Sequence, residues 1–128
     1  MQPPEHARVA HLATVNPGGR PHVVPICFVL DGGVLYTAVD EKPKRTRRLQ
    51  RLRNIESNPQ VEVVIDHYDE DWTQLWWVRL RGTARIVDDA RALELLAAKY
   101  PQYREQLPTG AVIAITVEER SEWTASPS

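Results

Sequence analysis

The sequence contains a single cysteine, Cys27, among its 128 residues. A lone thiol excludes an internal disulfide and a cysteine-rich metal site. No apolar run approaches the ~20 residues that a transmembrane helix needs, and the longest run, residues 23–30, contains a proline. The first residues lack the basic and apolar segments of a secretory signal. We therefore expect a cytoplasmic protein with no membrane partner.

The common catalytic motifs are also missing. The sequence has no glycine-rich phosphate loop, no His-Glu-x-x-His and no Gly-x-Ser-x-Gly, so it indicates no catalytic residue. One histidine, His67, lies within the acidic cluster 66–71. Because this cluster falls between two predicted strands and lacks cysteine, we expect a solvated loop, with a metal site as the alternative.

Charge is balanced overall but unevenly distributed. The net charge is −1, yet residues 42–53 hold seven of the sixteen basic residues and no acid, which leaves the rest of the chain at −8. This pattern favours a local anion site, with a solvated helix face as the alternative. The acidic remainder argues against nucleic acid as a partner.

The hydrophobic pattern predicts a small barrel. The hydrophobic (42%) and charged (26%) contents are typical of a globular protein, and the length fits one domain over residues 1–128. Turn signals at 16–19 and 31–33 predict that the first three strands form an antiparallel meander. Apolar spacing predicts a basic amphipathic helix to residue 57 and a second helix capped by Asp88 or Asp89 and ended by Pro101. The fold class is mainly β, a largely antiparallel barrel with two helices and six predicted strands: residues 9–15, 22–30, 34–39, 61–66, 74–87 and 111–117, with the first helix at 44–57.

Three positions within these strands are unusual. Pro25 cannot donate a ladder hydrogen bond, so it implies an edge strand, a bulge or a gap in the pairing. Cys27 lies in the same apolar run, so we expect its thiol to be buried and inert rather than a nucleophile. The adjacent Trp76 and Trp77 point to opposite faces of a strand, and both are buried only if both faces are covered. That arrangement suggests a partner subunit, with core packing or coverage of a planar ligand as the two roles for either ring.

The order of short motifs along the chain resembles a known family. The motifs are residues 13–25 (ATVNPGGRPHVVP), 35–37 (LYT), 42–44 (KPK), 52–61 (LRNIESNPQV), 71–72 (DW), 75–79 (LWWVR) and 82–84 (GTA). Their succession resembles the pyridoxamine 5'-phosphate oxidase-like split-barrel flavoproteins. Within that superfamily it is most similar to the branch of probable coenzyme F420-dependent oxidoreductases.

The resemblance implies a homodimer of FMN-binding-like split β-barrels with a cofactor at the subunit interface. It implies coenzyme F420, or alternatively FMN, and hydride transfer to a small conjugated acceptor. A non-enzymatic flavin- or deazaflavin-binding protein is a further alternative. By position in the family, the expected cofactor-binding residues are Val24, Pro25, Cys27, Thr37, Ala38 and Val39 at the ring, Lys42, Lys44, Arg48 and Arg51 at the phosphate, and Trp76 or Trp77 from the other subunit.

Overall fold

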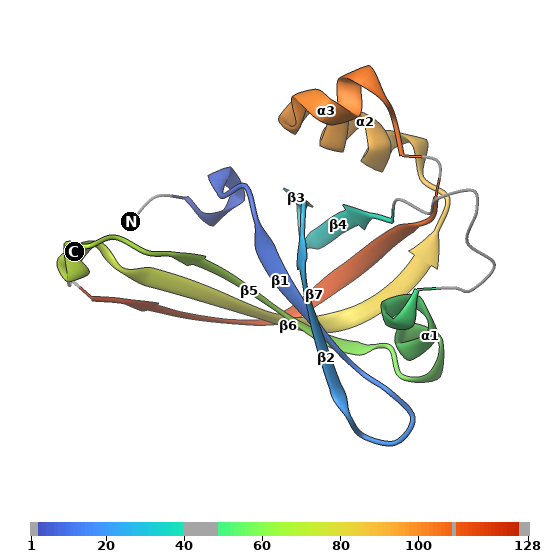
Figure 1. Ribbon diagram of the computed structural model, residues 1–128, viewed down its shortest axis with the longest axis horizontal. Helices are drawn as coiled ribbons and strands as arrows, with labels where there is room; N and C mark the ends of the chain where they lie inside the picture. The colour runs from blue at the N-terminus through green and yellow to red at the C-terminus, as the bar shows by residue number, and fades with distance from the viewer. Residues whose placement is uncertain (1–2, 40–48, 109, 126–128) are drawn as a thin grey trace.

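A computed structural model of the chain describes residues 3–39, 49–108 and 110–125. Seven antiparallel strands form one sheet in the order β2-β1-β5-β6-β7-β4-β3. The sheet curls strongly, and its two end strands, β2 and β3, do not pair with each other, so the barrel stays open (Figure 1). The strands are β1 (Ala10–Val15), β2 (Pro21–Ile26), β3 (Val29–Asp31), β4 (Val34–Ala38), β5 (Gln60–His67), β6 (Trp76–Val87) and β7 (Val112–Thr124).

The helices lie outside the sheet. α1 (Gln50–Ser57) packs against β1 and β6, whereas α2 (Ala90–Lys99) packs against β3 and β4. α3 (Pro101–Glu105) follows α2 directly and lies beside it (Figure 1). Two short 3-10 helices, η1 (Pro4–His6) and η2 (Trp72–Gln74), complete the described elements. None of the described helices is long and apolar enough to cross a bilayer.

The alternation predicted for the long strand at residues 74–87 is confirmed. Trp76, Val78 and Leu80 are buried on one face of β6, while Trp77 and Arg79 lie on the other. The predicted bend at Gly82 is also present, because the pairing of β6 with β7 shifts between residues 81 and 82. The Asp89 carboxylate accepts a hydrogen bond from the backbone N–H at position 92 (3.0 Å), so Asp89 is the cap of the second helix.

The predicted single strand over residues 22–30 is wrong, and so is the meander built on it. The chain leaves β2 at Ile26 and re-enters the sheet at Val29, in strand β3 at the opposite end of the strand order. Phe28, between the two strands, has backbone partners far away in sequence. Its N–H donates to the Tyr100 hydroxyl (3.0 Å), and its carbonyl accepts from the Lys99 ammonium (2.9 Å). The crossover places β2 at an edge of the sheet. An edge strand is one of the three explanations that the sequence offers for Pro25.

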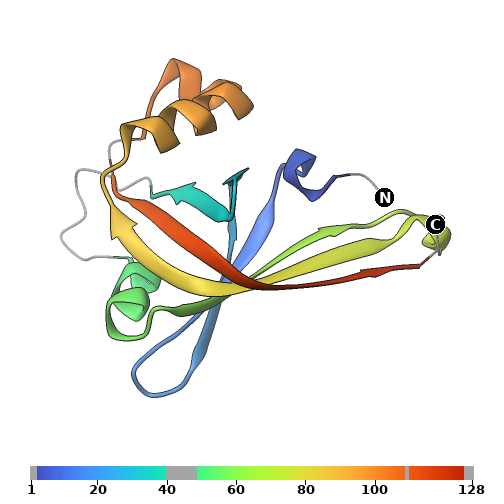
Figure 2. The ribbon, with the colours of Figure 1, turned by 180° about the vertical axis from the view of Figure 1, so that it is seen from behind.

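Strands β5, β6 and β7 extend past the rest of the barrel as an arm, which comprises residues 65–79 and 119–124. β1 pairs with β5 only up to position 64, and β4 pairs with β7 only up to position 116. Beyond these points β5 and β7 pair only with β6, and Figure 2 shows the three strands projecting together. The prediction that the last strand stops at 117 is wrong, because the mostly charged residues that follow still pair with β6.

Two apolar clusters stabilise this arrangement. The main core lies inside the curled sheet and includes the fully buried Phe28, Leu12, Leu35, Leu52 and Ile65. A second cluster lies beneath α2 and α3, where Ala38, Leu96 and Tyr100 pack with Cys27. Cys27 is therefore half-buried in a crossover between strands, rather than within a strand as predicted.

Candidate functional site

The residues expected at the cofactor ring lie near the crossover from β2 to β3, but they do not share one face. Val24 packs against the main core, whereas its neighbour Pro25 is exposed on the opposite side of β2. Cys27 follows in the crossover and contacts the second cluster. Only some of these side chains can therefore face one ligand, and their assignment to the ring stays a prediction.

The three expected residues of β4 and its end are tightly held. Thr37 is 2% exposed, and its hydroxyl donates to the Cys27 carbonyl (2.7 Å), which ties β4 to the crossover. Ala38 belongs to the second cluster, while the fully buried Val39 belongs to the main core. The Val39 N–H donates to the carbonyl of Ala111 (2.8 Å). The Val39 side chain is therefore part of the core beneath the end of β4 and presents no free surface to a ligand.

The helix expected to carry the phosphate contacts begins later than predicted. Leu49 has an extended backbone, so the described helix α1 begins at Gln50. The expected phosphate residues Lys42, Lys44 and Arg48 lie outside the described residues. Leu49 offers no side-chain hydrogen bond to cap the helix, and the first turn contains no acid. Unpaired N–H groups at such a helix start, together with its partial positive charge, favour an anion.

Arg51, in the first turn of α1, is the described residue best placed for an anion. Its Nε atom is buried and has no hydrogen-bond partner among the described residues. Burial lowers the pKa of Arg51, while the nearby Tyr103 hydroxyl acts in the opposite direction. A buried cationic donor without an acceptor is costly, because it has lost water without gaining a partner. A bound phosphate oxygen would supply both the missing acceptor and the compensating charge.

A buried asparagine anchors this helix to the barrel. The Asn54 side chain is fully buried; its Nδ2 donates to the Thr14 hydroxyl on β1 (3.0 Å), and its Oδ1 accepts from Gln50 Nε2 (2.7 Å). The Asn54 carbonyl also accepts from the Asn58 N–H (2.7 Å) and the Ser57 hydroxyl (3.1 Å) at the end of α1. These bonds fix the helix start relative to the sheet. Sequence reasoning did not single out Asn54, because its partner Thr14 lies forty positions away.

The two adjacent tryptophans occupy different environments within one copy of the chain. Trp76 is 4% exposed, belongs to the main core and stacks on His67, with ring centroids 5.9 Å apart. Trp77 is only half-buried on the outer face of the arm. Core packing thus accounts for Trp76 without a partner subunit. Of the two adjacent tryptophans, Trp77 is therefore the one whose ring is available to contact a ligand or a second copy of the chain.

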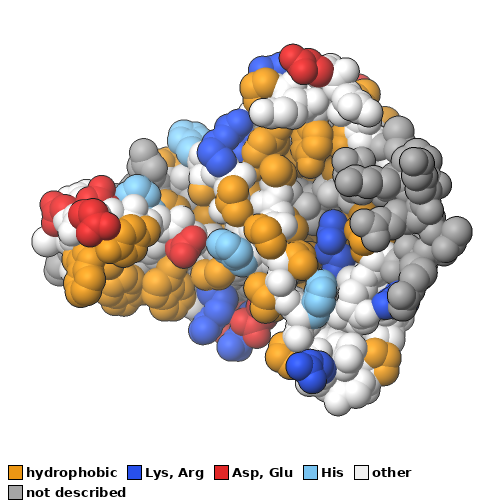
Figure 3. Space-filling model, in the orientation of Figure 1, with side chains coloured by type: hydrophobic (Ala, Val, Ile, Leu, Met, Phe, Trp, Pro, Cys, Tyr) orange, Lys and Arg blue, Asp and Glu red, His pale blue; other side chains and the backbone are white. Residues whose placement is uncertain are grey.

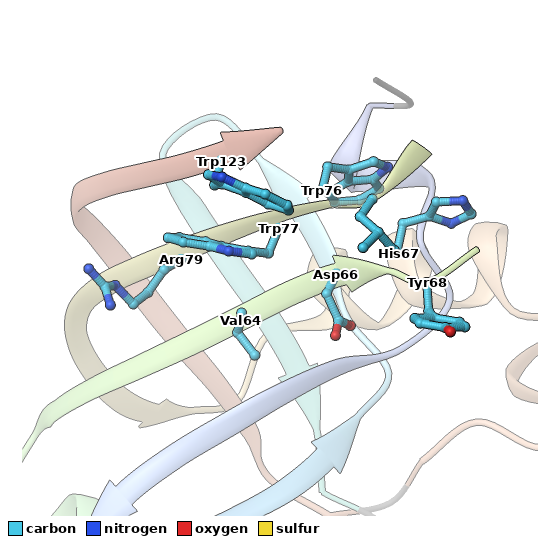
Figure 4. A pocket seen from close by; sticks show the side chains of 9 residues that line it. Val64, Asp66, His67, Tyr68, Trp76, Trp77, Arg79 and Trp123 are labelled. Carbon is cyan, nitrogen blue, oxygen red and sulfur yellow. The ribbon is translucent and has the colours of Figure 1, made fainter. Parts of the chain in front are cut away.

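A cavity of about 390 Å³ opens beside Trp77 on the arm (Figure 4). Its walls are mainly apolar or aromatic, with Asp66 and Arg79 as the charged side chains. The Trp123 ring lies next to that of Trp77, and the Arg79 guanidinium lies 5.6 Å from the Trp77 ring centroid. The complete lining is Val64, Asp66, His67, Tyr68, Leu75, Trp76, Trp77, Arg79 and Trp123. The sequence points to residues 66–74 and the C-terminal segment through Trp123 as shaping the pocket, but the predicted last strand ends at 117 and so misses the pairing of Trp123 with Trp77.

The acidic segment around His67 forms the tip of the arm. His67 ends β5, and its Nε2 lies 4.0 Å from an Asp69 carboxylate oxygen. Asp71 accepts hydrogen bonds from the Thr73 backbone N–H and hydroxyl, which lower the pKa of the Asp71 carboxyl. Among the described residues, no group of three or more histidine, cysteine, aspartate or glutamate side chains is arranged to hold a metal ion.

Comparison with solved structures identifies the fold. The heme storage protein HutZ from Vibrio cholerae superposes with a TM-score of 0.74 at 17% identity, covering 94% of this chain and 88% of HutZ. General Stress Protein 26 from Bacillus anthracis gives a TM-score of 0.69 at 22% identity, covering 91% of this chain and 84% of that one. An FAD-binding protein from Mesorhizobium loti superposes with a TM-score of 0.65 at 19% identity, covering 93% of this chain and 87% of that one. These likenesses show the predicted split β-barrel.

Comparison at the sequence level identifies the family. No curated protein matches the chain. The family model described as pyridoxamine 5'-phosphate oxidase matches residues 2–124, which is nearly the whole sequence. The resemblance carried by the seven motifs is thereby confirmed at the level of the family. The chain belongs to the pyridoxamine 5'-phosphate oxidase family.

Proposed function

We propose that this protein is an oxidoreductase that binds coenzyme F420 at the start of α1 and transfers a hydride between the reduced cofactor and a small conjugated acceptor. FMN is the alternative cofactor. Membership of the family supports a flavin-type cofactor, as does the likeness to the FAD-binding protein from Mesorhizobium loti. The observation that carries the proposal is the buried Nε of Arg51, which finds no hydrogen-bond acceptor within the described part of the chain.

The charge at the start of α1 fits a phosphate-bearing cofactor. Arg51 offers a planar, permanently charged donor group, which is well suited to phosphate oxygens. The basic segment 42–53 adds further cations, and among them Lys42 and Lys44 match the family positions most directly. F420 carries a phosphodiester and a glutamate tail, whereas FMN carries one phosphate. Seven basic residues therefore favour the longer anion.

The protein supplies position and environment for the reaction. When bound, the cofactor provides the hydride chemistry, as cofactors generally do. The hydrogen bond from Thr37 to the Cys27 carbonyl holds the crossover in place beside the second apolar cluster. Apolar side chains at Cys27 and Ala38, which pack in the same cluster, would exclude water from the ring. Fixed stacking of donor on acceptor accelerates transfer through proximity. We assign no acid or base to the chain.

A homodimer is part of the proposal. Trp77 is half-buried and Trp123 is 44% exposed on the outer face of the arm. Large aromatic side chains at a surface are typical of sites that a partner covers. We propose that Trp77 of one subunit reaches the cofactor of the other.

The direct test of the phosphate contact is the substitution Arg51→Gln, which keeps the side chain polar but removes its charge. Cofactor affinity should fall by about tenfold or more, since a charge-assisted hydrogen bond contributes about 1.5–3 kcal/mol. The matched control is Arg120→Gln on β7, where an exposed arginine pairs with Glu122. Equal affinity for Arg51→Gln and the control would contradict the assignment.

Turnover separates an enzyme from a binding protein. An oxidoreductase should reoxidise the reduced cofactor when a conjugated acceptor is added, and the absorbance of the cofactor reports this step. A bound cofactor that no acceptor reoxidises would favour the alternative of a non-enzymatic flavin- or deazaflavin-binding protein.

A further inference from the structure

His22 on β2 has a buried ring nitrogen that the described fold leaves unpaired. Its Nδ1 atom and the Nε atoms of Arg51 and Arg79 are buried without a hydrogen-bond partner among the described residues. Arg79 has a counter-charge, because a Glu62 carboxylate oxygen lies 3.8 Å from its Nε. His22 and Arg51 take part in none of the ion pairs within the same part of the chain. Burial of a polar nitrogen without a partner is costly, so both atoms indicate a missing acceptor.

Strand pairing directs the His22 ring towards α1. His22 lies directly opposite Thr14 in the pairing of β2 with β1, and paired residues point to the same face of a sheet. On that face, the Thr14 hydroxyl accepts a hydrogen bond from Asn54 Nδ2 on α1 (3.0 Å). Arg51 precedes Asn54 by one helical turn, and side chains three positions apart on a helix are neighbours. The two unpartnered nitrogens, one on β2 and one on α1, therefore belong to neighbours of the same contact.

The space beside these two nitrogens is open to a ligand. His22 and Arg51 are only half-buried as residues, and β2 is an edge strand of the sheet. Figure 3 shows a histidine side chain and a basic side chain close together at the surface in the region of β2 and α1. A small anion can therefore approach both side chains from solvent.

The charged groups around His22 favour an anion. On α1, Arg51 faces this space, whereas the Arg53 guanidinium donates to the side-chain oxygen of Gln50. On α3, the Tyr103 hydroxyl lies close enough to Arg51 to affect its pKa. The inner-facing neighbours of His22 on β1 and β2 are all uncharged: Ala10, Leu12, Thr14, Val24 and Ile26. The two strands thus bring no carboxylate to this face that would compete with a bound anion.

We propose that His22 is a second anion-binding residue of the cofactor site, whose protonated ring donates from Nδ1 to the phosphate group that Arg51 also binds. This inference rests on the proposed function, because it takes the anion to be the phosphate of F420 or FMN. An imidazolium beside a guanidinium is unfavourable alone and favourable around an anion, so phosphate binding is coupled to protonation of His22. Histidine changes its charge between about pH 5 and 8, so this coupling is measurable there.

Equilibrium titration with F420 at about pH 6 and about pH 8 compares the wild type with two variants of His22. His22→Gln lacks a donor at the position of Nδ1, whereas His22→Asn keeps a neutral one. Relative to the wild type, His22→Gln should bind F420 about five- to tenfold more weakly at the lower pH and by no more than about twofold at the higher pH. His22→Asn should show a smaller loss at the lower pH. The comparison at equal pH cancels the titration of the cofactor itself.

The matched control is His6→Gln, an exposed histidine in η1, which should bind F420 like the wild type at both pH values. An affinity of His22→Gln within about twofold of the wild type at the lower pH would overturn the inference and leave the proposed function in place. An equal loss at both pH values would do the same. If FMN binds in place of F420, the same comparison is made with FMN, which also carries a phosphate. Binding of neither cofactor to the wild type would contradict the proposed function and this inference together.

A measurement on the wild type is independent of how well the variants fold. The chain has four histidines, and nitrogen NMR of histidine-labelled protein distinguishes protonated from neutral rings. At neutral pH, saturation with the cofactor should shift the ring signals of His22 towards the protonated form and leave those of His6 in place. Unchanged His22 signals in the saturated protein would overturn the inference.

Discussion

The hydrogen bond between Asn54 and Thr14 should be essential for holding α1 against the barrel. Both side chains are buried, at 0% and 1% exposure, and the bond is 3.0 Å long. Asn54→Ala removes this bond and the one from Gln50, and it leaves the Thr14 hydroxyl without its donor. A buried polar group that loses its partner costs about 1–3 kcal/mol. With the lost packing added, we expect Asn54→Ala to lower the free energy of unfolding by about 2–4 kcal/mol.

A double-mutant cycle isolates the contribution of this bond. Thr14→Val removes the hydroxyl while keeping the shape of the side chain, and it is combined with Asn54→Ala. Urea unfolding, followed by tryptophan fluorescence and circular dichroism, gives the free energy of each variant. The two substitutions should be non-additive, with a coupling energy of about 0.5–1.5 kcal/mol. Additive effects, or a loss below about 0.5 kcal/mol for Asn54→Ala, would show that this bond does not hold α1 against the barrel.

Four further outcomes are expected. Gly82→Ala should lower the free energy of unfolding by about 1–3 kcal/mol, because the added Cβ would lie 2.2 Å from the Thr116 carbonyl oxygen and force the strands apart; urea unfolding measures this. Burial lowers the pKa of Lys99 to about 8. The unfolded chain therefore binds more protons above that pH, and the stability of the wild type relative to Lys99→Met should rise from about pH 8 towards pH 10. Lys44→Glu should weaken cofactor binding in a fluorescence titration, and an unchanged affinity would remove Lys44 from the phosphate site. Trp77→Ala should weaken both the dimer and cofactor binding, which sedimentation and titration test separately; a native dimer with normal binding would refute the interface role.

Local signals in the sequence predict much of the fold. The alternation of apolar and polar residues along β6 correctly identifies its buried and exposed faces. Successive side chains of a strand point to opposite faces, so the apolar set must lie on the face that packs on the core. The cap at Asp89 and the hairpin around Gly32, whose φ is +62°, are also local features that residue type dictates. These predictions require no knowledge of distant contacts.

The errors arise where distant residues decide the structure. The run around Phe28 is apolar throughout, so nothing local marks the break between β2 and β3. Its backbone is satisfied by Lys99 and Tyr100, more than seventy positions away. In the same way, the pairing of Trp123 with Trp77 depends on a strand that continues through charged residues. The cavity on the arm is therefore not predictable from the sequence, whereas the basic start of α1 is.

A side-by-side equilibrium titration of the purified protein with coenzyme F420 and with FMN at moderate salt determines which cofactor the barrel binds. We expect saturable binding of F420 with weaker binding of FMN, and a loss of F420 affinity in Arg51→Gln. A preference for FMN would assign the protein to the alternative cofactor. Binding of neither would contradict the claim that this barrel has a cofactor site at the start of α1.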